Sequence, residues 1–343
     1  MNKRFRYLML ALLCLAPLAR AVAADRVKLA QGSQSSGKLT EISPTELVLE
    51  IGSTKKKYAV NMVEAVQFDK EPNDLAQARI AVHAGRFSDA VTLLGKIDTA
   101  KIERAEILKD IEFFKAIAAA RLALAGNGSK ADAGKKLFAF EKAGRNSFHY
   151  FETCETLGDL LFALNKYSDA ETYYNKLAEA PWPDHKMRAA VLIGRALVGQ
   201  KQYDQANAKF DEALAIEGKG DETDRQRLAA RLGKASALAG GGKTDDAIKL
   251  VEEIINQADA ENLELHARAY NVLGNCYKTA GKKKEALLAF LHVDLLYSRF
   301  GDLHAEALAN LATLWTDLDK ADRAAQARET LKEKYPASAW IGD

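Results

Sequence analysis

One short pattern of residues returns about every 34 to 36 positions over most of this chain of 343 residues. In its clearest copies a glycine is followed twelve residues later by an alanine and sixteen residues later by an aromatic residue. The copies begin at Gly158, Gly194 and Gly274, and end at Tyr174, Phe210 and Phe290. A period of this length predicts an array of stacked helical hairpins instead of one closed core.

The pattern extends from residue 73 to residue 338, with degenerate copies headed by Ala78, Gly233 and Ala312. It resembles the tetratricopeptide-repeat (TPR) family, in which each repeat is a pair of antiparallel helices. Small residues at the eighth and twentieth positions let the paired helices approach closely, and aromatic residues at the seventeenth and twenty-fourth fill the space between hairpins. Pro336 stands where that family ends its second helix. We therefore expect residues 71–343 to form a mainly α, TPR-like solenoid of about seven hairpins.

Residues 25–70 have a different pattern, with alternating apolar residues typical of short β-strands. Leu47, Leu49 and Ile51 alternate with Val48 and Glu50, and glycine, serine and proline separate the runs. This segment predicts a small β module, a barrel or sheet loosely similar to Sm-like or SH3-like barrels. We expect the basic run at residues 55–57 to lie at a hairpin tip.

Residues 1–24 have the composition of a signal peptide. A basic start precedes an apolar run from Leu8 to Leu18, and Ala21 and Ala23 fit a small-residue cleavage site. The apolar run is too short for a comfortable bilayer span. The sequence thus predicts an exported protein, periplasmic or secreted. With its β module and array, the chain resembles exported bacterial TPR proteins of the cell envelope.

Charge and cysteine content exclude several classes of protein. The signal segment holds four of the 49 basic residues and none of the 47 acidic ones, which leaves a net charge of −2 for the rest. This balance gives no general attraction to nucleic acid or anionic lipid. No later stretch is apolar enough for a membrane span. Cys154 and Cys276 are about 120 residues apart, and we expect buried thiols and not a disulfide framework.

No catalytic, metal or cofactor motif stands out in the sequence. The six histidines do not form a pair at the spacing of metal ligands on a helix. The run from Gly240 to Thr244 lacks the spacing and the preceding strand of a phosphate-binding loop, so it predicts a turn. We expect no enzyme activity. A buried cluster joining His149, Glu152 and an acid of a neighbouring repeat would favour an enzyme instead.

The resemblance to TPR arrays implies that the first helix of each hairpin lines a concave groove. The polar residues that would face it are Glu152, Glu155, Asp159, Arg188, Arg195, Arg268, Asn271, Asn275, Lys278 and Asn310. The groove would run from an acidic end to a basic, amide-rich end that can grip a peptide. Asn271 stands where chaperone-binding TPR domains have a lysine, which puts capture of a terminal carboxylate in doubt. The alternative is that these residues form a solvated helix face.

These features together favour a non-enzymatic scaffold of the periplasm or cell envelope, with a protein or peptide partner held in the groove. An alternative from another class is a cell-wall or glycan-binding adaptor that uses the β module. Exposed aromatic residues would favour it, and Tyr58 and Phe68 are the module's candidates. The enzyme with a site on the solenoid edge is the second alternative.

Overall fold

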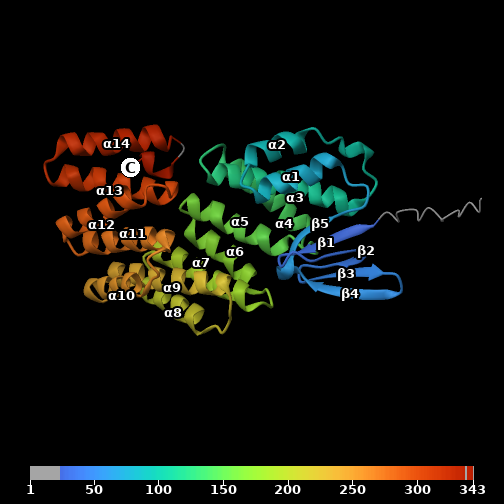
Figure 1. Cartoon of the computed structure of the whole chain (residues 1–343), viewed down its shortest axis with the longest axis horizontal. Coiled ribbons are helices and arrows are strands. Elements are labelled where there is room, and N and C mark those ends of the chain that lie inside the picture. Colours follow the sequence, from blue (N-terminus) through green and yellow to red (C-terminus); the bar gives the residue numbers. More distant parts are fainter. Residues whose placement is uncertain (1–23, 337, 343) are drawn as a thin grey trace, which may run out of the picture.

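The computed structural model describes residues 24–336 and 338–342. The predicted signal peptide covers residues 1–24, and residues 1–23 lie outside the described part. Five strands come first and fourteen α-helices follow within the described residues (Figure 1). The predicted fold class, a helical solenoid preceded by a small β structure, is confirmed.

The five strands form one antiparallel sheet in the order β4-β3-β2-β1-β5. Their bounds are β1 (Asp25–Leu29), β2 (Gln34–Ile42), β3 (Glu46–Ile51), β4 (Thr54–Ala59) and β5 (Val63–Gln67). A short 3-10 helix, Val60–Met62, connects β4 to β5. The sheet stays open, because β5 pairs with β1 and β4 pairs with β3. The strands β4 and β5 are therefore its two edges.

The predicted position of the basic run was wrong. Lys55, Lys56 and Lys57 lie within β4, where they pair with Glu50, Leu49 and Val48 of β3. The turn itself is made by residues 52–53 between paired Ile51 and Thr54. Lysine on an exposed edge strand discourages pairing with another chain, which explains why the run fits there.

The helices form seven consecutive antiparallel pairs. They are α1 (Asn73–His83) and α2 (Phe87–Gly95), α3 (Ala105–Leu124) and α4 (Lys130–Ala143), α5 (Tyr150–Ala163) and α6 (Tyr167–Ala178), α7 (Pro183–Gly199) and α8 (Tyr203–Ala215), α9 (Asp221–Gly240) and α10 (Thr244–Gln257), α11 (Leu263–Thr279) and α12 (Lys283–Leu296), α13 (Gly301–Asp317) and α14 (Ala321–Lys334). In Figure 1 the array passes from α1 at upper right through α8 below to α14 at upper left. We call the odd-numbered members the first helices.

The repeated interval from glycine to aromatic residue has a direct structural cause. A Cβ atom on Gly158 would stand 2.3 Å from Tyr174 Cε1, and one on Gly194 would stand 2.6 Å from Phe210 Cε1. The ring of the second helix therefore packs on the bare backbone of the first helix. Neither ring is more than 1% exposed. Close packing of this kind leaves no room for a larger residue.

The sheet and the first hairpins share one hydrophobic core. Val27 and Phe68 from the β module pack in the same cluster as Leu75 of α1 and Ile107 of α3. Tyr58 and Phe68 are only 5% and 2% exposed. The β module is thus packed on the array, and the aromatic residues that a glycan-binding surface would need are buried.

No helix among the described residues has both the length and the apolar character that a membrane crossing requires.

Candidate functional site

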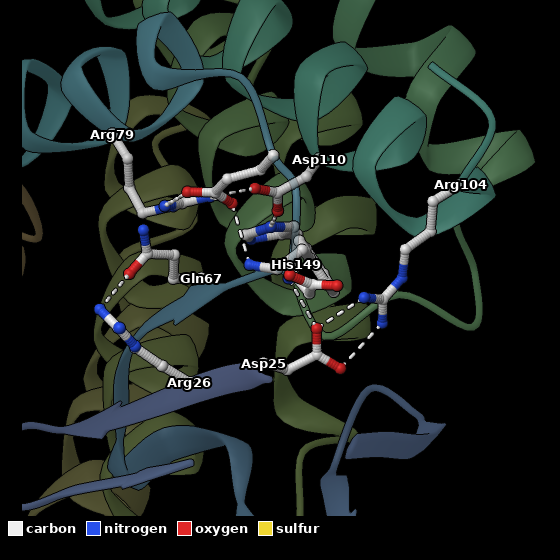
Figure 2. Close-up of polar contacts among 10 residues, drawn as sticks. Asp25, Arg26, Gln67, Arg79, Arg104, Asp110 and His149 are labelled. Atoms are coloured by element: carbon white, nitrogen blue, oxygen red, sulfur yellow. Dashed lines mark hydrogen bonds and ion pairs between the residues drawn. The ribbon is translucent and has the colours of Figure 1, made fainter. Parts of the chain in front are cut away.

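A buried ionic network lies where the β module meets the array (Figure 2). The Arg79 guanidinium of α1 donates to both Glu71 oxygens at 3.0 Å and to Asp110 of α3 at 2.8 Å. The other oxygen of Asp110 lies 2.7 Å from His149 Nε2, at the start of α5. His149 also stacks on the Phe113 ring, with 3.6 Å between ring centroids. The network ties three first helices to the segment that follows β5.

A second ionic contact fixes the first strand. Both oxygens of Asp25 accept hydrogen bonds from Arg104, at 2.6 and 3.0 Å, and Figure 2 shows this fork. The backbone amides of Leu39 and Asp69 also donate to Asp25, each at 2.8 Å. Burial alone would raise the pKa of Asp25, but these four hydrogen bonds outweigh it and hold the pKa below its ordinary value.

A cavity of about 300 Å³ opens beside this network. Its walls come from β5 and from the first helices α1, α3, α5 and α7, together with the 3-10 helix before β5 and the segment before α5. The charged and histidine residues that line it are Glu64, Arg79, His83, Asp110, Arg121, His149, Glu152, Glu155, His185 and Arg188. The first helices of the array therefore face a hollow that the β module closes on one side.

The predicted groove residues of α5 and α7 meet across neighbouring hairpins. Arg188 contacts Glu155 at 3.3 Å and Glu222 of α9 at 3.1 Å. Asp159 lies 3.6 Å from Arg121 of α3 and accepts a hydrogen bond from Tyr174. Burial raises the pKa of Glu155 and of Asp159 more than the neighbouring arginines lower it. The arginines thus do not fully offset the cost of burying these two charged carboxylates.

Among the described residues, no hydrogen bond or ion pair joins three of the predicted groove residues to the other seven. Glu152 is exposed and lines the cavity, with no ion pair found for it among the described residues. Arg195 lies over the Phe162 ring, 5.2 Å from its centroid. Arg268 pairs with Glu264 on its own helix at 2.7 Å. Arg195 and Arg268 are both exposed.

The predicted amide-rich end of the groove is occupied by a side chain of the protein itself. Asn271 and Asn275 of α11 donate to the two oxygens of Glu306 on α13, at 3.2 and 3.1 Å. Lys278 donates to Asn310 at 2.6 Å. Burial raises the pKa of Glu306 despite the two amide hydrogen bonds. The amides therefore already bind a carboxylate of this chain.

Several of these partners were missed in the sequence. Glu306 had a signal, because it is the second residue of the repeat whose eighth residue is Ala312, and that position was expected to face the groove. Asp110 and Arg121 lie in α3, in a hairpin for which the repeat pattern gives no clear glycine-to-aromatic copy and therefore no groove positions. His304 lies 2.8 Å from Asp294 of α12 and 2.7 Å from the Tyr335 hydroxyl. These contacts join three separate segments, so the spacing of residues along one helix does not reveal them.

The described residues give little support for a reactive nucleophile or a metal site. Burial raises the pKa of Cys154 and of Cys276 to about 12, so neither is a ready thiolate. No cluster of three or more histidine, cysteine or acidic side chains suited to a metal ion occurs in the part of the chain that the structure covers. His149 pairs with Asp110 and not with Glu152.

A family model for the tetratricopeptide repeat matches residues 155–222, 191–262 and 232–293. Residues 155–293 are a run of tetratricopeptide repeats. The matched residues cover α6 to α11 in full, where the glycine-to-aromatic packing recurs. No curated protein matches the sequence.

Solved structures of other proteins share the fold of this chain at low sequence identity. A tetratricopeptide repeat protein from Parabacteroides merdae is 15% identical, with a TM-score of 0.57 over 79% of this chain and 98% of that one. A Rap protein complexed with competence and sporulation factor is 17% identical, with a TM-score of 0.55 over 78% and 76%. NprR in complex with its cognate peptide NprX is 15% identical, with a TM-score of 0.51 over 78% and 81%.

Proposed function

We propose that this protein is a non-enzymatic scaffold that binds a peptide or helical segment of a partner protein along its first helices. The observation that carries the proposal is the hollow lined by α1, α3, α5 and α7, together with the polar side chains that continue on α9, α11 and α13. A repeat array spreads many weak contacts over such a surface, so no single residue need dominate the affinity.

The structural neighbours support this proposal. Two proteins of the same fold were solved as complexes, the Rap protein with competence and sporulation factor and NprR with its cognate peptide NprX. Their identity to this chain is below 20%, so they contribute a precedent for the fold and not a ligand. We further propose that the protein works in the periplasm or at the cell envelope, on the signal-peptide composition of residues 1–24.

The glycan-binding alternative is less well supported, because Tyr58 and Phe68 belong to the shared core and are not exposed. The enzyme alternative loses its expected cluster, because His149 is held by Asp110 and stacked on Phe113. The acids and bases of that network satisfy one another, which is typical of a structural joint.

Crosslinking and pull-down from an envelope extract tests the scaffold proposal. The bait is the mature chain, residues 25–343 without the predicted signal peptide. The β module is kept because it shares the core of the array. The groove variant is Arg195→Ala with Arg268→Ala, because both side chains are exposed and neither forms an ion pair with another predicted groove residue in the described part of the chain. Lys249→Ala with Lys332→Ala is the matched control, with two exposed cations on second helices α10 and α14.

We expect a partner that the intact chain and the control capture and that the groove variant captures several-fold less. Capture of the same proteins by all three baits would contradict binding along the first helices. Circular dichroism of each variant checks that the helical content is unchanged.

A further inference from the structure

The cavity of about 300 Å³ meets β5 along the edge of the strand. Four consecutive residues of β5, from Val63 to Val66, line it. Successive side chains of a strand point to opposite faces, so a cavity that touches all four runs beside the backbone. Within the described residues β5 forms ladder pairs with β1 alone, which leaves its other side as an open sheet edge. An open edge is where an extended peptide adds a strand.

Among the residues that the structure describes, each arginine of the cavity wall already faces an acid, so none is free for an anionic ligand. Arg79 is held by Glu71 and Asp110, and Arg121 lies by Asp159. Arg188 bridges Glu155 and Glu222, so all three arginines that line the cavity already face acids of this chain. An incoming carboxylate would have to displace one of these contacts.

Two carboxylates of the cavity, in contrast, are available to a cationic ligand. Glu152 reaches the cavity, and no ion pair or side-chain hydrogen bond involves it in the described part of the chain. Glu155 lines the same cavity, and its carboxylate lies 3.3 Å from the guanidinium of Arg188. Burial raises its pKa, which means that its negative charge is poorly solvated. A positive group placed beside these two carboxylates would offset that cost.

Aromatic side chains supply the remaining wall. Phe114, Phe148, Phe151 and Trp182 all line the cavity. Lysine and arginine have an apolar stem that packs on such rings and a cationic end that is attracted to their faces. A small metal ion or an amine without a stem would not use this surface.

We propose that this cavity binds an extended, basic segment of a partner protein. The backbone of the segment adds to the free edge of β5, and a lysine or arginine side chain passes the aromatic wall to reach Glu152 and Glu155. The inference rests on the scaffold function and narrows it: the β module is then half of the recognition site, and the partner carries a cation at the point where it crosses from the module to the array.

Fluorescence anisotropy with the full mature chain tests this directly. The probes are labelled peptides of about eight residues, the length of a strand, with alternating serine and valine and a central lysine, arginine, glutamate or leucine. We expect the lysine and arginine peptides to bind at least about tenfold more tightly than the other two. Methylation of alternate backbone nitrogens in the lysine peptide should remove binding, because it blocks pairing with β5 without changing the protein.

The protein variants are Glu152→Gln alone and Glu152→Gln with Glu155→Gln. We expect the double variant to weaken the lysine peptide by about tenfold or more and the single variant to weaken it less. Glu253→Gln, which removes an exposed acid of α10, should have no effect. The single variant neutralises a carboxylate for which no ion pair is found among the described residues, so the test stands even if the double variant folds poorly.

Equal binding of the glutamate peptide, absence of binding by the lysine peptide, or unchanged affinity in both variants would overturn the proposal. Failure here is separable from failure of the scaffold function. If the pull-down partner depends on Arg195 and Arg268 while the lysine peptide does not bind, only the basic-segment inference falls. If the pull-down also yields no partner that depends on the first helices, both fall.

Discussion

Single glycines decide how closely the paired helices of this array approach. A Cβ on Gly274 would stand 2.7 Å from Phe290, and one on Gly233 would stand 2.4 Å from Phe210 of the preceding hairpin. Aromatic residues at the seventeenth position of the repeat also pack on glycines of the next hairpin, as Tyr167 does on Gly199. The conserved spacing within this one sequence thus reflects contacts both inside a hairpin and between neighbours.

The variant Gly194→Ala should destabilise the protein. Its new Cβ would overlap the fully buried Phe210 ring, and overpacking of this kind costs about 1–3 kcal/mol. Urea denaturation followed by circular dichroism measures the loss in the free energy of unfolding. Gly134→Ala in α4 is the control, because nothing lies within 4 Å of its added Cβ, and alanine there should be neutral or slightly stabilising. Equal losses at both positions would contradict the packing explanation.

Residue spacing predicted the repeats well and the polar contacts poorly. Ten groove residues were predicted from the TPR frame, and the structure places Glu155 beside Arg188 and Lys278 beside Asn310. The role of Glu306 as the partner of two asparagines was not predicted. A frame gives the face on which a side chain lies, but which acid meets which base depends on the distance between neighbouring helices. Whether this surface binds a peptide stays a prediction.

At the scale of elements, β1 is held by charge as much as by its ladder. Asp25 opens the strand and is 3% exposed. It accepts four hydrogen bonds, two from Arg104 directly before α3, one from β2 and one from the segment after β5. The sequence indicated strands here through alternation, but alternation carries no information about an ion pair with a helix that begins far along the chain.

The pH dependence of stability should report this contact. The folded-state pKa of Asp25 lies below its unfolded value of 3.8, so its contribution is complete above that value and is lost as the pH falls through the folded pKa. Asp25→Asn should therefore cost about 2 kcal/mol at pH 6, and its deficit relative to the native sequence should shrink below about pH 4. Denaturation curves at several pH values measure this. The control is Asp89→Asn, which removes an exposed pair with Arg86 and should change the free energy of unfolding little at any pH. A deficit of Asp25→Asn that stays constant down to pH 2 would refute the argument.

At the scale of the whole molecule, the β module and the first hairpins are one folding unit, while later repeats contact chiefly their neighbours. The largest hydrophobic cluster includes residues from β1 to α5, and separate clusters serve the hairpins of α7, α11 and α13. The sequence placed a change of structure near Pro72, but it gave no sign that the two parts share a core, because long-range packing leaves no local pattern.

Deleting residues 25–70 should therefore damage one end of the array and spare the other. Removing the module exposes Leu75 and Ile107 and leaves Arg104 without Asp25. Hydrogen exchange should show protection lost in α1 to α4 and largely retained in α11 to α14, since stability in a repeat array falls off with distance from the damage. Uniform loss of protection would mean that the array folds as a single cooperative block, and no loss in α1 would mean that the module is dispensable.

The pair formed by Asp25 and Arg104 joins residues 79 positions apart. A chain made from its amino end exposes β1 long before α3 exists to receive it, whereas each helical hairpin can close as soon as its own two helices are complete. The first strand thus pairs with β2 and β5 early, but it gains the two hydrogen bonds from Arg104 only after residue 104 has been made. The β module therefore completes its contacts only when the first helical hairpin, α1 and α2, already exists.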